Sequence, residues 1–204
     1  MSIRSSIGSM IAAALAITAF GCSSSDSGGG STAPGSVSSG IPDSTVLSTL
    51  TAAQITQLNK AVTDYETAAG ASLSKAQVCG GMGYLMAAMQ YALATSTADA
   101  TLQASCKSTA DSCNQTAGTP TTGGGTSTGS TGETATTLTG CTATVAQYQA
   151  CAKDKTDATM AVFKNAPACT GLTGASMAGA TTSAAAPASC DTLATACPNA
   201  EMAM

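Results

Sequence analysis

The chain has 204 residues, few aromatic side chains (two Phe, four Tyr, no Trp) and a net charge of −4. Arg4 is the only arginine, and the remaining charges form no basic patch, which argues against a nucleic-acid partner. The absence of histidine excludes Ser-His-Asp and Cys-His catalysis and the His-containing zinc sites. With so few large side chains to bury, we expect the nine cysteines to supplement a small core.

Residues 1–21 have the pattern of an export signal. Arg4 precedes an apolar stretch at 7–20 that is too short to span a bilayer. The following Ala19-Phe20-Gly21-Cys22 resembles the bacterial lipobox, although Ala19 stands where Leu is usual and Phe20 is large for its position. We therefore predict that Cys22 is the lipidated, palmitate-bearing first residue of the mature protein. The alternative is an ordinary signal peptide that is cut at the same bond and releases a secreted soluble protein.

Residues 22–44 predict a flexible tether that links the lipid anchor to a folded domain. Most of this stretch is Ser and Gly, a composition typical of flexible linkers. Ser23, directly after the cysteine, favours outer-membrane sorting. We expect a protein that is held to the membrane by its lipid and faces the periplasm or the cell surface.

The first predicted helix begins at the capping box Thr51-Ala-Ala-Gln54. Leu50 and Ile55 flank the box as a hydrophobic staple, and apolar residues then recur at helical spacing as far as Tyr65, with Gly70 as a stop.

The second predicted helix begins at the capping box Ser74-Lys-Ala-Gln77. It carries an apolar stripe that we expect to face the core: Cys79, Met82, Met86, Met89 and Leu93. The glycines at 80, 81 and 83 predict a break near its start, because glycine disfavours the helical state.

Three further helices follow. The first covers Asp99–Cys113, with Leu102, Cys106 and Cys113 facing inward; the second runs from the capping box at Thr144 towards Phe163; the third is short, at 191–196. Between the first two lies a low-complexity loop at 117–137, and residues 199–204 predict a frayed tail. Since no segment shows strand alternation, we predict an all-α fold, with a single disulfide-stapled domain over 45–198.

Eight cysteines remain besides Cys22, and an even number in an exported chain indicates disulfides. Three precede the low-complexity loop and five follow it: Cys79, Cys106 and Cys113, then Cys141, Cys151, Cys169, Cys190 and Cys197. Because both numbers are odd, full pairing requires that an odd number of bonds cross the loop. Cys106 and Cys113 are seven residues apart, and so are Cys190 and Cys197. On a helix this spacing corresponds to about 10 Å along the axis, which is too far for a disulfide between the two cysteines. Each of these cysteines must therefore bond to another element; the partners stay open.

The second half resembles a known group of proteins. The segments Cys141-TATVAQYQA-Cys151, Pro167-Ala-Cys169-TGL and Cys190-DTLATA-Cys197, with the Cys22-SSSDSGGG start, are similar to uncharacterised cysteine-rich lipoproteins of Gram-negative bacteria. The resemblance implies export and disulfides, and it implies no activity. The chain departs from the group at Leu58-Asn59, where Leu-Cys is expected.

No catalytic motif stands out, so we predict a non-catalytic interaction or structural module without a cofactor. The alternative is a protein that binds Cu(I), a soft metal, through Cys79, Met82, Met86 and Met89; a methionine-filled core is the simpler interpretation. Asp154 and Asp157 lie one turn apart among lysines, which favours a solvated helix face over acid/base carboxylates.

Overall fold

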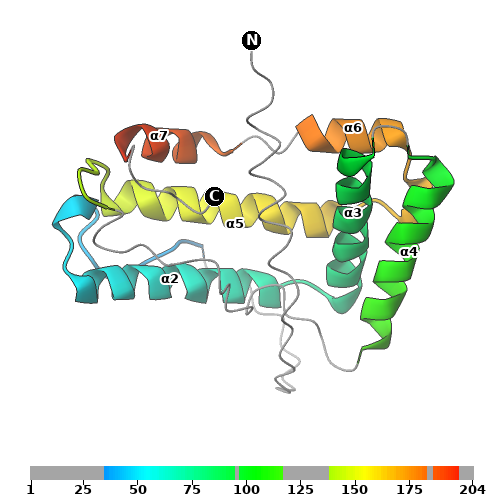
Figure 1. The fold of residues 1–204 in the computed structure, drawn as a ribbon. Coiled ribbons are helices and arrows are strands. Elements are labelled where there is room, and N and C mark those ends of the chain that lie inside the picture. Colours follow the sequence, from blue (N-terminus) through cyan, green and yellow to red (C-terminus); the bar gives the residue numbers. More distant parts are fainter. Residues whose placement is uncertain (1–34, 95–96, 117–137, 183–185, 198–204) are drawn as a thin grey trace, which may run out of the picture. The chain divides into compact units, whose positions relative to one another are not determined.

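The computed structural model describes residues 35–94, 97–116, 138–182 and 186–197 (Figure 1). These residues form helices and loops without a strand, which confirms the all-α prediction. The predicted signal peptide, the start of the tether, the loop at 117–137 and the tail at 199–204 lie outside them. The element order is η3 (Leu47–Thr49), α2 (Ala52–Ala71), α3 (Lys75–Leu93), α4 (Asp99–Gln115), α5 (Val145–Asn165), η4 (Cys169–Gly171), α6 (Gly174–Thr182) and α7 (Ala188–Ala196).

The described residues divide into two compact units that interleave along the chain. The α3–α4 unit comprises residues 73–116 and 160–182, and the α2–α5 unit comprises 35–72, 138–159 and 186–197. Helix α5 is shared, since its residues up to Thr159 belong to the α2–α5 unit and those from Met160 to the other. That residues 45–198, with both units, fold as a single domain stays a prediction.

All three predicted capping boxes are confirmed. At the start of α2, Gln54 N donates to Thr51 Oγ1 at 3.3 Å while Thr51 N donates to Gln54 Oε1 at 3.0 Å. Ser74 and Gln77 exchange the same pair of bonds at the start of α3. Thr144 does so with Gln147 before α5. Each box satisfies backbone N–H groups that a helix start leaves unpaired, so these helices begin where the sequence predicts.

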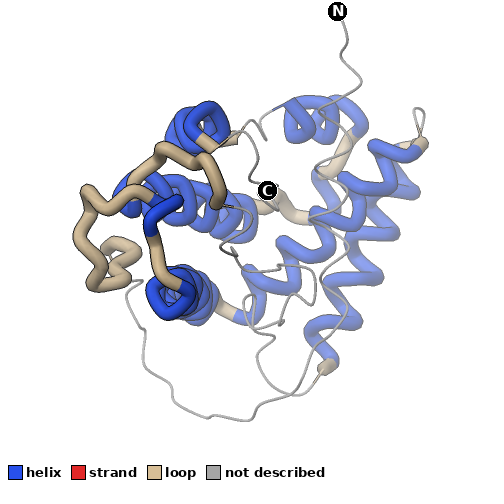
Figure 2. Tube along the Cα trace, turned by 60° about the vertical axis from the view of Figure 1, so that its left-hand side comes forward, coloured by secondary structure: helices blue, strands red, loops and turns tan. Residues whose placement is uncertain are grey.

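Helices α3 and α4 form an antiparallel hairpin. The disulfide Cys79–Cys113 joins the first turns of α3 to the end of α4, with 5.4 Å between the Cα atoms. At the same end, Lys75 Nζ donates to Thr116 O at 2.7 Å. The two helices lie side by side in Figures 1 and 2.

The predicted break near the glycines of α3 is wrong, because α3 is continuous from Lys75 to Leu93. A Cβ on Gly81 would lie 2.2 Å from the Phe163 ring, and one on Gly83 would lie 2.5 Å from Cys106 O. The glycines therefore lower helix propensity but let a ring and a neighbouring backbone approach α3 more closely than any side chain would allow.

The core of the α3–α4 unit is completed by residues that follow α5. Five buried residues cluster there: Ala87, Leu102, Cys106, Leu172 and Met177. Gln103 Nε2 donates to Leu172 O at 2.9 Å, and the disulfide Cys106–Cys169 joins α4 to η4. This bond crosses residues 117–137, so the parity prediction is confirmed.

Helix α6 was not predicted from the sequence. It begins with Thr173 and Ser176, which exchange backbone-to-hydroxyl hydrogen bonds at 3.0 and 3.1 Å, as in a capping box with Ser in place of Glu or Gln. Gly174 N also donates to Asp99 Oδ1 at 2.8 Å, which places a carboxylate at the positive end of the helix.

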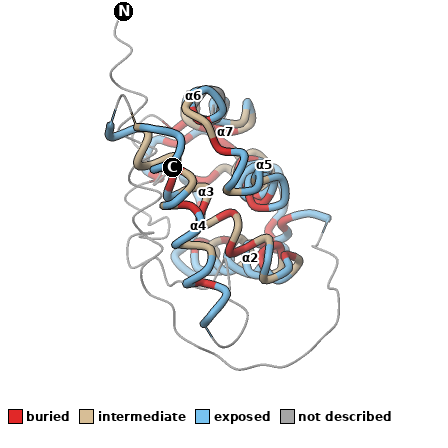
Figure 3. Tube along the Cα trace, turned by 90° about the vertical axis from the view of Figure 1, so that its right-hand side faces the viewer, coloured by how far each residue is buried: buried red, intermediate tan, exposed pale blue. Residues whose placement is uncertain are grey.

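In the α2–α5 unit, two disulfides hold α7 antiparallel to α5. Cys151–Cys190 joins the helices, and Cys141–Cys197 joins the residues that flank them. Helix α7 begins directly after Pro187, three residues before the predicted start. The core of this unit combines Leu58 of α2 and Leu193 of α7 with apolar residues of the loops that precede α2 and α5. Those loops lie together (Figure 2) and pair at the isolated bridge Val46–Thr144. Figure 3 shows buried positions as short segments alternating with exposed ones along the helices.

Candidate functional site

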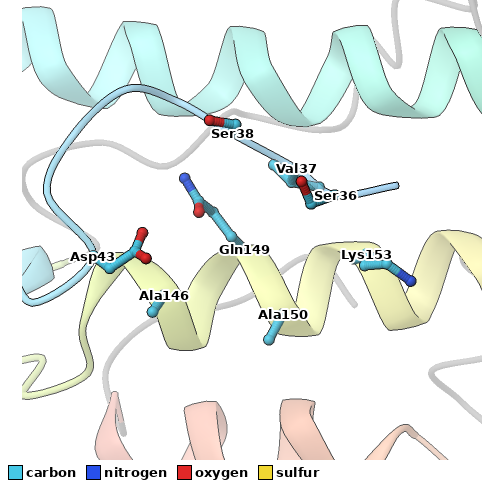
Figure 4. A pocket seen from close by; sticks show the side chains of 8 residues that line it. All are labelled: Ser36, Val37, Ser38, Asp43, Ala146, Gln149, Ala150 and Lys153. Carbon is cyan, nitrogen blue, oxygen red and sulfur yellow. The ribbon is translucent and has the colours of Figure 1, made fainter. Parts of the chain in front are cut away.

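A hollow of about 320 Å³ lies in the α2–α5 unit, between the segment that precedes η3 and the first turns of α5 (Figure 4). Its lining is Ser36, Val37, Ser38, Asp43, Ala146, Gln149, Ala150 and Lys153. Figure 4 shows Asp43 and Lys153 towards opposite ends of the hollow, with Gln149 between them. The four α5 residues share one helix face, because they follow one another at three- and four-residue steps.

The outer wall of the hollow is an extended segment that is packed against both helices. Burial alternates along it: Val37, Ser39 and Ile41 are each only 6% exposed, whereas Ser36 and Ser38 face solvent. The predicted flexible tether over 22–44 is therefore wrong for its last part, residues 35–44. The Ser/Gly-rich composition concealed the apolar side chains at alternate positions, which dock the segment onto the core.

Two glutamines anchor this wall. Gln57 Nε2, from α2, donates to Ser39 O at 2.5 Å. The buried Gln149 amide, from α5, lies 2.7 Å from Ser39 Oγ. With its oxygen towards Ser39, that amide accepts from Ser39 Oγ at 2.7 Å and from Ser39 N at 3.1 Å, and it donates to Val37 O at 3.3 Å. Because these bonds satisfy buried polar groups, they hold the wall in place.

The basic end of the hollow is fixed by a chain of hydrogen bonds. Lys153 Nζ donates to Asp157 Oδ2 at 2.5 Å, and the buried Tyr65 hydroxyl, from α2, donates to Asp157 Oδ1 at 2.8 Å. The hydrogen bond to Asp157 raises the pKa of Lys153, so the ammonium group remains charged at neutral pH. Burial, and then the hydrogen bond to Asp157, raises the pKa of Tyr65, so its hydroxyl remains protonated and donates.

The arrangement is suited to binding a small polar molecule. Lys153 carries three N–H donors, so the bond to Asp157 leaves donors for an anionic group. The carboxylate of Asp43 offers an acceptor for a cationic group, and the exposed hydroxyls of Ser36 and Ser38 can donate or accept. Ala146 and Ala150 contribute small apolar side chains. A short zwitterionic segment, with an amine at one end and a carboxylate at the other, matches this distribution of charge.

Asp154 and Asp157 lie on a solvated face of α5, as predicted, and they also bond to neighbouring helices. Asp154 and Asp157 are exposed, as expected, but each also bonds a different helix: Asp157 accepts from Tyr65 of α2, and Asp154 accepts from Ser189 at the start of α7 at 2.7 Å. The sequence missed these bonds because residues 92 and 35 positions apart carry no local signal.

All eight predicted disulfide cysteines are bonded in pairs: Cys79–Cys113, Cys106–Cys169, Cys141–Cys197 and Cys151–Cys190. As predicted, the cysteines that lie seven residues apart bond to other elements and not to each other. Among the residues that the structure describes, no three His, Cys, Asp or Glu side chains gather as metal ligands. Nor does a helix in the described ranges combine the length and hydrophobicity of a membrane span.

The soft-metal hypothesis loses its thiolate, because the Cys79 sulfur is bonded to Cys113. Of the apolar stripe that was expected to face the core, Cys79 is buried, but the expectation is wrong for the rest: Met82 and Met89 are only half-buried, Met86 is 42% exposed, and Leu93 is 70% exposed. The buried face of α3 instead carries Val78, Cys79, Gly81, Gly83 and Ala87. Glycine and alanine line the packed side because α4 and Phe163 approach there, which turns the long side chains outward.

Cys22, the predicted lipidation site, lies outside the described residues. The hollow was not predicted either, since Asp43, Gln149 and Lys153 belong to separate segments without a motif. The one local signal of the hollow's outer wall was the single Val among the Ser residues at 36–39. Comparisons with protein-family models, with curated proteins and with solved structures found no match to this chain.

Proposed function

We propose that the protein is an outer-membrane lipoprotein, anchored through acylated Cys22, that acts as a non-catalytic interaction module of the cell envelope. The observation that carries this proposal is the use of cysteine. Four disulfides take up eight of the nine cysteines, and the cysteine that they leave out is Cys22, at the end of the apolar leader. Disulfides persist in oxidising compartments, so the bonded set supports export.

Anchoring is tested by expressing the full chain in a Gram-negative host and measuring the mature protein. We expect an intact mass that corresponds to Cys22 as first residue with added acyl groups, and partition into the detergent phase. The Cys22→Ser variant should appear in the aqueous phase with the same helical circular dichroism. An unmodified N-terminal mass, with the wild-type protein wholly aqueous, would contradict the anchor and support the secreted alternative.

The interaction surface that we expect is the hollow beside α5, because its wall is fixed while its lining offers charges of both signs. A photo-crosslinking residue in place of the exposed Ser38 tests this in cells. The same residue in place of Ser108, which is exposed on α4 in the other unit, provides the matched control. We expect one defined crosslinked product from position 38 and none from position 108.

The charge requirement is tested in the same assay. Lys153→Gln should abolish the crosslink from position 38, because it removes the cation of the hollow. Lys107→Gln removes an equivalent lysine, paired with Asp111 four residues further on at 2.5 Å, and should leave the crosslink unchanged. Equal crosslinking from positions 38 and 108, or no effect of Lys153→Gln, would contradict the assignment of the hollow.

A further inference from the structure

Three methionines follow one another along the accessible side of α3. Met82, Met86 and Met89 lie at positions i, i+4 and i+7, so they share one helix face; we refer to them as the methionine stripe. Met86 is 42% exposed, and Met82 and Met89 are half-buried. A buried methionine is an ordinary filler of apolar cores. Three thioethers on the accessible face of one helix therefore need a different explanation.

The same unit contains methionines that do fill the core. Met177 is fully buried and Met160 is 7% exposed. Every cysteine in the described ranges is in a disulfide, so these residues present no free thiol. Among the described residues, the reduced sulfur atoms that meet solvent therefore gather in the methionine stripe.

We propose that the methionine stripe is a site of reversible oxidation, in which peroxide or hypochlorous acid converts the thioethers to sulfoxides, Met86 first. Hypochlorous acid transfers its oxygen to the sulfur, which loses two electrons, while the chlorine gains them and leaves as chloride with release of a proton. With hydrogen peroxide the oxygen is transferred in the same way and water leaves. Methionine sulfoxide reductases reverse the change with reducing equivalents from a thiol.

The fold allows oxidation of the stripe without loss of structure. A sulfoxide is polar and would disrupt a core, but the packed side of α3 is formed by other residues, among them Cys79, Gly83 and Ala87. Oxidation would instead change a surface. Leu85 is half-buried and Leu93 is 70% exposed on the same side as the stripe, so sulfoxides would make this apolar face polar while α3 and α4 remain bonded through Cys79–Cys113.

The experiment treats the full mature protein with increasing equivalents of hypochlorous acid and quantifies each methionine by peptide mass spectrometry. Of the five methionines in the described ranges, we expect Met86 to oxidise first, Met82 and Met89 next, and Met160 and Met177 at least roughly tenfold more slowly, because a buried thioether reacts only through opening of the fold. Helical circular dichroism should be unchanged when the stripe is fully oxidised, and sulfoxide reductase should restore the original mass.

One variant and one denaturing condition separate the effect of exposure from that of sequence context. Replacing the stripe by leucines (Met82→Leu, Met86→Leu and Met89→Leu) should remove the fast phase and leave Met160 and Met177 as slow as before. In denaturant, the five methionines of the described ranges (Met82, Met86, Met89, Met160 and Met177) should react at similar rates. Oxidation of Met177 at a rate similar to that of Met86 in the folded protein would overturn the proposal, as would unfolding on oxidation of the stripe.

Discussion

The α3–α4 unit and the α2–α5 unit each contain two disulfides and two cysteines seven residues apart, but they use them in opposite order. In α4 the second cysteine bonds a helix (Cys113 to Cys79) and the first bonds the short η4; in α7 the first cysteine bonds a helix (Cys190 to Cys151). Both cysteines of the first pair lie in α4, where residue i+7 returns to the same face, whereas Cys197 lies directly after the end of α7. The equal spacing does not by itself indicate a repeated unit.

The interiors of the two units also differ. The α3–α4 unit brings helices together through glycine and alanine, and its longer methionine side chains on α3 face outward. The α2–α5 unit has a larger described core with several leucines, and polar side chains connect its elements around a hollow. Disulfides can thus supplement a close-packed, small-residue interface in one unit and a conventional apolar core in the other.

The comparison predicts that disulfides matter more to the α3–α4 unit. Replacing Cys79 and Cys113 together by Ala should lower the free energy of unfolding by about 2–5 kcal/mol. The corresponding replacement of Cys151 and Cys190 should cost less, because more apolar area still holds α2, α5 and α7. Urea unfolding followed by amide exchange in α4 and α7 measures both; a larger loss in the α2–α5 unit would contradict the comparison.

The two kinds of methionine in the α3–α4 unit should respond differently to truncation. Met177→Ala removes a fully buried side chain and should cost about 2–5 kcal/mol. Met86→Ala, at an exposed position, should change the free energy of unfolding by no more than about 0.5 kcal/mol. Equal losses in thermal or urea unfolding would mean that the methionine stripe is covered in solution.

The glycine-based contact is tested by adding a single methyl group. Gly83→Ala should cost about 1–3 kcal/mol, because the new Cβ would lie 2.5 Å from the backbone oxygen of Cys106. Gly80→Ala is the matched control: its Cβ would meet nothing within 4 Å, and the gain in helix propensity should stabilise the protein by up to about 1 kcal/mol. If Gly83→Ala and Gly80→Ala changed the free energy of unfolding in the same direction, that result would argue against close packing of α3 on α4.

The smallest expected effect concerns the hydrogen bonds of the α2–α5 unit. Tyr65→Phe should lower the free energy of unfolding by about 0.5–1.5 kcal/mol, because Asp157 loses a donor. The pKa of Tyr65 is raised above 10 in the folded protein, so its contribution is fully present below pH 10 and declines as the pH rises through the folded value. The difference between wild type and variant should therefore shrink above pH 10; a constant difference would rule out this bond as its source.

The sequence predicted the elements that depend on local signals. Capping boxes at Thr51, Ser74 and Thr144 located three helix starts, and cysteine parity predicted a bond across residues 117–137. It failed where packing overrides propensity. Gly81 and Gly83 predict a break if judged by propensity alone, whereas their function is to admit Phe163 and α4, which no local pattern reveals.

The candidate site was harder to predict because it is assembled from distant parts. Gln149 bonds Ser39 and Tyr65 bonds Asp157 across separations of 110 and 92 residues. The docked segment at 35–41 has the composition of a linker, and only the alternate burial of Val37 and Ile41 distinguishes it. The methionine stripe had the correct helical period, but periodicity cannot say which of two apolar faces of a helix is packed.

The central claim is that the parts of the chain before and after residues 117–137 are joined by one disulfide, Cys106–Cys169, which lies within the α3–α4 unit. It is tested by engineering one protease site near Gly124, cutting the folded protein and running denaturing gels without reductant. We predict one band for the wild type and for the Cys151→Ala, Cys190→Ala double variant, and two bands for the Cys106→Ala, Cys169→Ala double variant. Two bands from the cut wild-type protein without reductant, or one band from the Cys106, Cys169 variant, would contradict the pairing.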